Sequence, residues 1–354
     1  MSDKGMFTGV THSAGGNGRS TAPLETRSQG EKALLGRIQA LVGPALRETE
    51  QSFLKELESR HPFVGEVLEH LMTYRGKRLR PMLLLLSAQA AGGIVHGHHV
   101  LAAVVEMIHT ATLVHDDVLD EADTRRHVAT INSRWNTETS VLLGDYLFTH
   151  AFHLTSSLGR ADACRLIGRA TNIVCEGEMA QISERGNLDL TEEKYLEIVE
   201  GKTAELCAIS CYLGGLLAGA TESVCEALDA YGRALGIAFQ IADDLLDVVG
   251  TEAATGKSLG SDLEKQKLTL PVISLLSNVR GTEREEVRAL LAHPDQHARE
   301  RLQPYLERYG ALAYARTRAT EYIVAARQHL TALPDSPARR LLEDIAEYVT
   351  DRNT

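Results

Sequence analysis

The sequence lacks several features that would indicate other classes of protein. Its 354 residues include 37 basic and 48 acidic side chains, a formal net charge of −11. This balance argues against nucleic acid and against an anionic membrane surface as partners. No apolar run reaches the roughly 18 residues that a membrane-spanning helix needs. The polar N-terminus lacks the apolar segment of a secretory signal peptide, so we expect a cytoplasmic protein without a stable membrane span.

Cysteine is scarce. Only five are present, and no two form a C-x-x-C pair. Cys207 and Cys211 would share a helix face, but no further cysteine or histidine pair completes a zinc set. We expect buried free thiols in a reducing compartment.

Strand patterns are almost absent, whereas helical patterns extend over most of the chain. Apolar residues recur at helical spacing, as in Leu228, Tyr231 and Leu235. Residues 1–30 are rich in Gly, Ser and Thr and indicate a flexible tail. Because no linker or repeat divides the remainder, we predict that residues 31–354 form one large all-α domain.

Two aspartate clusters of the same design lie far apart in the chain. Asp116-Asp117-Val118-Leu119-Asp120 and Asp243-Asp244-Leu245-Leu246-Asp247 both read D-D-x-x-D and both lie in apolar, helical stretches. Within a helix, three carboxylates at this spacing fall within about 100° of arc. Buried carboxylates need a cation, and Mg²⁺ prefers oxygen ligands of this kind together with water and phosphate. One copy alone would usually be a solvated helix face, but two copies favour facing walls of a Mg²⁺–diphosphate site.

Basic residues near the clusters are candidate phosphate ligands. Gly76-Lys77-Arg78-Leu79-Arg80-Pro81 opens an apolar helix, and the N-terminus of a helix with nearby Lys and Arg favours anions. Each of the other basic candidates could be a surface charge, but together they form a set of possible phosphate ligands. These are Arg125, Arg126, Lys202, Lys257 and Lys267.

These motifs, in this order, resemble the trans-prenyltransferases, or polyprenyl diphosphate synthases. The resemblance runs from about Leu34 to Pro271. It rests on Gly-Lys-Arg-Leu-Arg-Pro (76–81), Asp-Asp-Val-Leu-Asp (116–120) with Arg125-Arg126, Gly-Asp-Tyr-Leu-Phe (144–148), Glu176-Gly-Glu178 with Gln181, Lys202-Thr203, Phe-Gln-Ile-Ala-Asp-Asp-Leu-Leu-Asp (239–247), and Gly256-Lys257 followed by Gly260, Asp262 and Lys267. It implies a helical bundle of the isoprenoid synthase type with a central active-site cavity, and a homodimer.

The resemblance also implies roles for individual residues. Metal ligands for Mg²⁺, three ions in all, would be Asp116, Asp120, Asp243, Asp244 and Asp247, with Asp117 in support. The allylic diphosphate would be held by Arg125, Lys202, Thr203, Gln240 and Lys257. The diphosphate of isopentenyl diphosphate would be held by Lys77, Arg80, His109 and Arg126, and Lys267 is a further candidate substrate ligand. The residues expected to act in catalysis are Asp116, Asp117, Asp120, Arg125, Lys202 and Asp243.

Residues one helical turn before Asp116 are expected to lie beneath the diphosphate site. In the family that the sequence resembles, bulky aromatics there stop chain growth early. Here the positions hold the small Ala111 and Thr112, and Ile108 would line the next layer. The sequence therefore predicts all-trans products longer than C20, made from isopentenyl diphosphate and a starter such as farnesyl or geranylgeranyl diphosphate.

Other interpretations remain open. One is a short-chain synthase that makes C15–C20 products. A class I terpene cyclase would carry N-D-x-x-S-x-x-x-E as its second motif, and a non-catalytic subunit would be expected to lose aspartates. A di-iron bundle would need a second E-x-x-H beyond Glu106 and His109. His127 and Asn136 stand where glycine is common in the family, Ala129 stands where proline is common, and Gln266 stands where glycine is common before Lys267. We therefore expect unusual geometry in the loop after the first cluster.

Overall fold

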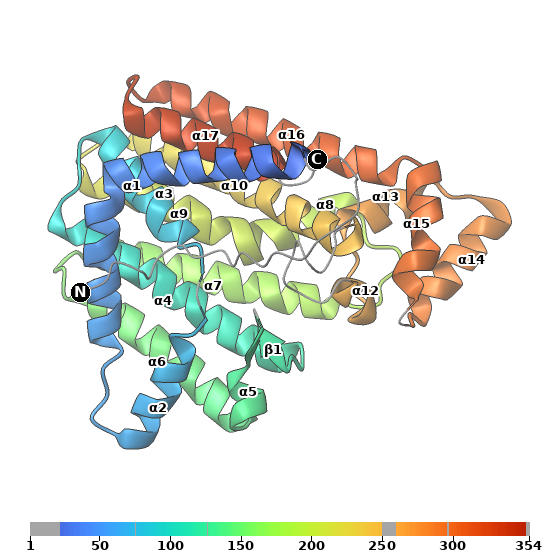
Figure 1. Ribbon diagram of the computed structural model, residues 1–354, viewed down its shortest axis with the longest axis horizontal. Coiled ribbons are helices and arrows are strands. Elements are labelled where there is room, and N and C mark those ends of the chain that lie inside the picture. The colour runs from blue at the N-terminus through green and yellow to red at the C-terminus, as the bar shows by residue number, and fades with distance from the viewer. Residues whose placement is uncertain (1–21, 75, 126, 250–259, 296, 352–354) are drawn as a thin grey trace.

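The computed structural model describes residues 22–74, 76–125, 127–249, 260–295 and 297–351, which are helical almost throughout (Figure 1). The prediction of an all-α fold is confirmed. The first helix begins at Ala22, inside the stretch predicted to be a flexible tail. Residues 1–21 lie outside the described part of the chain.

The first half of the chain contains seven described helices and a short hairpin. The helices are α1 (Ala22–Glu56), α2 (Pro62–Leu71), α3 (Leu79–Ala91), α4 (His96–Leu119), α5 (Ile131–Arg134), α6 (Thr137–Ser156) and α7 (Ala161–Ser183). The strands β1 (Thr124–Arg125) and β2 (Val128–Ala129) pair antiparallel directly after α4.

The second half begins with α8 (Glu192–Val199), which continues through the π-helical turn η1 (Glu200–Ala204) into α9 (Glu205–Leu217). The elements that follow are α10 (Glu222–Val249), α12 (Ser261–Glu264), α13 (Leu270–Asn278), α14 (Gly281–Ala292), α15 (Ala298–Arg308), α16 (Ala311–His329), the 3₁₀ turn η2 (Leu330–Ala332) and α17 (Pro337–Asp351).

The helices form layers. Figure 1 shows α1, α16 and α17 along one side of the bundle, α9 and α10 beneath them, and α4, α6 and α7 toward the opposite side. Helix α4 contacts α1, α3, α6 and α9, and most of its residues are buried. A helix enclosed in this way needs no polar face, which explains its apolar sequence around Glu106 and His109.

All five cysteines are free, as expected, and Cys207, Cys211 and Cys225 are buried. The expectation of burial is wrong for Cys175, which is exposed. Among the described helices, none is both long enough and apolar enough to cross a membrane.

Glycines bring three backbones unusually close around η1. A Cβ on Gly177 of α7 would lie 2.4 Å from the backbone nitrogen of Lys202, and one on Gly236 of α10 would lie 2.5 Å from Cα of Ala204. Such distances leave no room for a side chain. The π-helical turn is thus fixed between α7 and α10, and π-helical turns often occur at functional sites.

We predict that Gly177→Ala lowers the free energy of unfolding by about 1–3 kcal/mol, because the added methyl group must push α7 away from η1. Gly168→Ala on the same helix is the matched control. Its Cβ would meet only Phe152, at 3.9 Å, so we expect no loss and a gain of up to about 1 kcal/mol. Urea unfolding measures both variants, and equal stability of the two would contradict the packing argument.

Candidate active site

The first aspartate cluster lies where α4 ends. Asp116 and Asp117 belong to its last turn, whereas Asp120 is the residue that ends the helix, with φ −99° and ψ 1°. The three carboxylates therefore do not act as one helical face. Each meets a different basic side chain.

Asp117 is the most deeply buried of the three, at 1% exposure. It accepts a 2.7 Å hydrogen bond from Nε of Arg125 in β1. Its other oxygen, Oδ2, is buried and has no hydrogen-bond partner. Burial raises the pKa of Asp117, and Arg125 partly offsets this. Arg125, predicted as a substrate ligand, is thus engaged with the aspartate cluster in this structure.

Asp120 is held by basic groups from two distant segments. Nζ of Lys267 lies 2.8 Å from Oδ1, Nζ of Lys265 lies 3.3 Å from Oδ2, and Nη2 of Arg185 lies 3.1 Å from Oδ1. Burial would raise the pKa of Asp120, but the lysines around it lower the pKa below its ordinary value. Lys267 was expected near the site as a substrate ligand, and here it contacts Asp120.

Arg185 and Lys265 contact Asp120 but were not among the site residues predicted from the sequence. A weak signal was present for Arg185, because it follows Glu178 and Gln181 at helical spacing, although α7 ends at Ser183 and Arg185 lies in the turn after it. Lys265 gave no comparable signal, since only the fold brings its segment to the end of α4.

Lys202 links the cluster to η1 and α7. Its Nζ forms an ion pair with Glu178, donates to Oε1 of Gln181 at 2.8 Å, and lies 3.9 Å from Oδ2 of Asp116. Burial raises the pKa of Asp116 to about 6, with Lys202 opposing and Glu178 adding to the shift. Burial would lower the pKa of Lys202, but Asp116 and Glu178 raise it above its ordinary value. Lys202 therefore stays charged.

The second cluster on α10 is built differently. Asp244 is buried and accepts hydrogen bonds from Oη of Tyr195 at 2.6 Å and from Nε2 of Gln240 at 2.7 Å. Gln240 in turn accepts from Oγ1 of Thr203 at 2.9 Å. Burial raises the pKa of Asp244 to about 8, and Asp262 adds to the shift. Both oxygens of Asp244 thus accept hydrogen bonds within the protein, and its role as a metal ligand stays a prediction.

Asp243 and Asp247 flank this network and are half-buried. Oδ2 of Asp247 accepts a 3.3 Å hydrogen bond from the backbone nitrogen of Asp262. Thr203 and Gln240, predicted as substrate ligands, are brought together with Asp244.

The residues predicted to hold isopentenyl diphosphate lie around the start of α3 and on α4. Lys77 is exposed and forms a 3.1 Å ion pair with Glu31. Arg80 is half-buried, and its Nε is buried without a hydrogen-bond partner. His109 is half-buried on α4. Two further predicted ligands, Arg126 and Lys257, lie outside the described residues.

The predicted chain-length residues lie on α4 before Asp116. Ala111 and Ile108 are fully buried, and Thr112 is half-buried with its Oγ1 donating to the backbone oxygen of His109 at 2.7 Å. Their position beneath the cluster agrees with the helix geometry that we assumed. Their effect on product length stays a prediction.

Left-handed backbone conformations at non-glycine residues gather around the motifs. In the described ranges they occur at Arg78 (φ 52°), Glu121 (φ 48°), His127 (φ 64°) and Gln266 (φ 53°). All four adjoin the aspartate cluster or the basic residues, and such strain is typical of functional sites. Two of them, His127 and Gln266, stand where the family that the sequence resembles commonly has glycine, which adopts this conformation freely.

The donor set suits a hard cation. Asp116 and Asp117 are carboxylates with raised pKa values, and Asp117 keeps a buried, unpartnered oxygen. Within the described ranges, no three metal-binding side chains are already gathered around one point. Basic side chains lie next to Asp116 and Asp120.

The two ends of the first cluster should affect stability in opposite directions. The pKa of Asp116 in the folded protein, about 6, lies above its ordinary value of 3.8. Its charged form therefore destabilises the fold at high pH. We predict that Asp116→Asn stabilises the metal-free protein by about 1–3 kcal/mol at pH 8, and that the gain fades between pH 6 and 4.

Asp120→Asn is the matched comparison and should destabilise the protein by roughly 1–3 kcal/mol at pH 8, because its ion pairs are lost. The pKa of Asp120 is lowered, so this contribution persists until the pH falls below the ordinary range of an aspartate. Urea unfolding between pH 4 and 8 measures both effects. The same sign for both variants at pH 8 would contradict the electrostatic description.

The chain matches known proteins over most of its length. Residues 61–308 match the family model described as Polyprenyl synthetase. The sequence is 36% identical to octaprenyl diphosphate synthase of Escherichia coli (strain K12) over 322 residues, which is 90% of this chain and 99% of that protein.

Solved structures agree. A decaprenyl diphosphate synthase from Rhodobacter capsulatus superposes with a TM-score of 0.86 at 38% identity and covers 90% of this chain and 99% of its own. A polyprenyl synthase from Caulobacter crescentus CB15, complexed with calcium and isoprenyl diphosphate, has a TM-score of 0.85 at 33% identity. The match covers 90% of this chain and 98% of that protein's chain. The chain therefore belongs to the polyprenyl synthetase family and is a prenyltransferase of the polyprenyl diphosphate synthase type.

Proposed function

We propose that the protein elongates an allylic diphosphate with isopentenyl diphosphate units in a Mg²⁺-dependent reaction and releases an all-trans polyprenyl diphosphate longer than C20. One observation carries the proposal most directly. Asp116 and Asp120 lie among Lys202, Lys265, Lys267 and Arg185, which come from three separate segments. Carboxylates can bind a divalent cation and the neighbouring basic side chains can bind phosphate oxygens, so this arrangement suits a divalent cation and a diphosphate bound together.

Asp116, Asp120 and Asp243 would hold Mg²⁺, which supplies charge neutralisation on the diphosphate leaving group. Lys202 and Lys267 would then exchange their aspartate partners for phosphate oxygens and stabilise the negative charge that develops as the allylic C–O bond breaks. Asp244, fixed by Tyr195 and Gln240, would keep the wall on α10 rigid.

Other residues would handle the second substrate. Arg80 has a buried Nε without an acceptor, and a bound diphosphate would supply one; Lys77 and His109 would complete this site. The double bond of isopentenyl diphosphate would attack the allylic carbon. A proton would then leave the adduct, with the departing pyrophosphate as its acceptor. The apolar residues of α4 below Asp116 would exclude water, which would otherwise capture the allylic cation.

The direct test is incubation with farnesyl diphosphate, isopentenyl diphosphate and Mg²⁺, followed by mass spectrometry of the lipid products. We expect polyprenyl diphosphates longer than C20, and no product when EDTA replaces Mg²⁺. Cyclic hydrocarbons would indicate a cyclase instead. Absence of turnover would favour a non-catalytic subunit, and products that stop at C15–C20 would indicate a short-chain synthase.

The length of the prenyl product should depend on how far along α4 a bulky side chain is introduced. We predict that Ala111→Phe shortens the products, because its ring would block the space below Asp116. Ile108→Phe should stop growth later, since Ile108 lies about 4.5 Å further along the helix. Mass spectrometry of both product series measures this, and unchanged product length in Ala111→Phe would contradict the placement of the gate.

We also propose that the protein is a homodimer that buries exposed apolar side chains of α6 and α7. These are Val141, Leu142, Phe152, Met179 and Ile182, and Leu142 is 67% exposed. The two helices contact one another, so their exposed residues can contribute to one apolar surface of the kind that marks an interface.

Light scattering should give twice the chain mass of 38.6 kDa. Leu142→Glu should give monomers, because a charge would be buried at the interface. Val324→Glu on α16, where the valine is 52% exposed, is the control and should stay dimeric. A monomeric wild-type protein, or a Leu142→Glu variant that remains fully dimeric, would contradict the proposed interface.

A further inference from the structure

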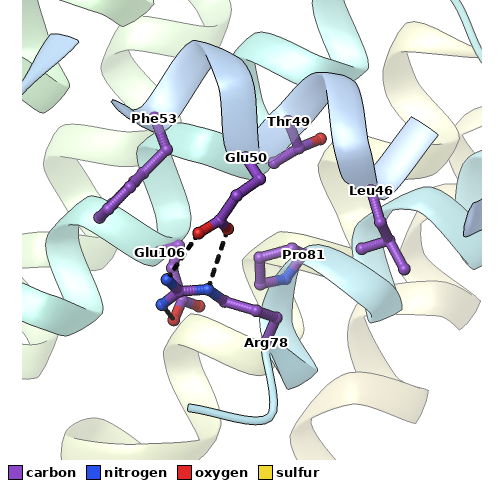
Figure 2. Close-up of a pocket in the computed structure, with 7 residues that line it drawn as sticks. All are labelled: Leu46, Thr49, Glu50, Phe53, Arg78, Pro81 and Glu106. Atoms are coloured by element: carbon purple, nitrogen blue, oxygen red, sulfur yellow. Dashed lines mark hydrogen bonds and ion pairs between the residues drawn. The ribbon is translucent and has the colours of Figure 1, made fainter. Parts of the chain in front are cut away.

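Arg78 occupies an unusual place in the basic motif at the start of α3. It lies between Lys77 and Arg80, yet its side chain turns toward α1 and α4 (Figure 2). Its backbone is left-handed, with φ 52° and ψ 38°, at the residue that caps α3. No side-chain hydrogen bond caps this end of the helix. The turn that carries Lys77 and Arg80 is therefore strained and must be held by other contacts.

The guanidinium of Arg78 joins two other helices. Nε and Nη2 donate to the carboxylate of Glu50 on α1, at 3.2 and 3.1 Å, and Nη1 donates to Oε1 of Glu106 on α4, at 2.7 Å (Figure 2). The ring of Phe53 lies 5.2 Å from the guanidinium carbon. The cavity beside these residues measures about 10 Å³, too small for a substrate and near the minimum for one water. The three charged groups thus form a closed structural link.

Glu106 connects Arg78 to the part of α4 that carries His109, one of the residues predicted to bind isopentenyl diphosphate. It is 5% exposed, so its charge depends on Arg78 as a partner. It lies three residues before His109, and residues at this spacing share one face of a helix. Arg78 thus connects the turn bearing two predicted diphosphate ligands to the part of α4 that bears the third.

We propose that Arg78 is a positioning residue for isopentenyl diphosphate, which fixes Lys77 and Arg80 relative to His109 through Glu106 and Glu50. The inference rests on the proposed function, because it assumes that these three residues hold that diphosphate. A planar guanidinium can engage both carboxylates at once, and a lysine ammonium lacks this fork. The allylic diphosphate, at the far end of α4, should not depend on Arg78.

Steady-state kinetics of Arg78→Met test the proposal. We expect KM for isopentenyl diphosphate to rise by about ten- to a hundredfold, the range seen when groups that orient metal-binding side chains are lost. KM for the allylic diphosphate should stay within about twofold of the wild-type value, a change well below that range. Arg78→Lys should fail to restore the wild-type KM.

Arg318 provides a matched control far from these residues. It forms ion pairs with Glu192, at 2.8 Å, and with Glu321, and its guanidinium carbon lies 5.5 Å from the ring of Tyr322. Arg318→Met removes the same kind of ionic and aromatic contacts and should leave both KM values unchanged. An equal rise in KM for isopentenyl diphosphate in this control would show that the Arg78 effect is nonspecific.

A double variant separates positioning from stability. Arg78→Met alone leaves Glu106 buried and unpaired, whereas Arg78→Met with Glu106→Gln removes that charge. We expect the double variant to regain unfolding stability but to keep the raised KM. Recovery of the wild-type KM in the double variant, or a wild-type KM in Arg78→Lys or Arg78→Met, would overturn the proposal. Failure of the wild-type protein to consume isopentenyl diphosphate would instead reject the proposed function, so the two failures are distinguishable.

Discussion

Pairing between buried aspartates and basic side chains from distant segments is the interaction on which the site depends. Carboxylates at the end of α4 would be very unfavourable in an apolar bundle without these partners. Lys265 and Lys267 bring their segment onto Asp120, and Arg185 adds the turn that follows α7. The same contacts that stabilise the metal-free protein therefore assemble elements that are remote in sequence. They also keep cations beside the place where a diphosphate would bind.

Close backbone packing supplies the second requirement, which is placement of Lys202. Gly177 and Gly236 let α7 and α10 approach η1 until no side chain could fit between them. The π-helical turn then presents Lys202 toward Asp116 and Thr203 toward Gln240. A rigid frame of this kind is what a binding site needs in order to hold charged groups in a defined geometry. The site thus combines tight packing on one side with ion pairs that a ligand can replace on the other.

The sequence predicted the fold class and the location of the first cluster, because helical periodicity and paired motifs are local signals. It did not predict that Asp117 turns to Arg125 while Asp120 ends the helix, since both depend on tertiary contacts. The π-helical turn that carries Lys202 was not predicted either, and in the structure it packs closely against Gly177. Asp244 illustrates the same limit, because its hydrogen bond from Tyr195 of another helix depends on the fold and could not be predicted from its motif. The unusual geometry expected of the loop after the first cluster stays a prediction, and His127 in that loop adopts a left-handed backbone.

We infer that the aspartates and basic residues form one coupled site for a divalent cation and a diphosphate. Calorimetric titration of the full-length protein with inorganic pyrophosphate, with and without Mg²⁺, tests it most directly after correction for the complex that the two form in solution. We expect at least about tenfold tighter pyrophosphate binding with Mg²⁺, and an equal effect of pyrophosphate on Mg²⁺ affinity, because binding free energies are reciprocally coupled. Pyrophosphate binding of the same affinity in the presence and absence of Mg²⁺ would contradict it.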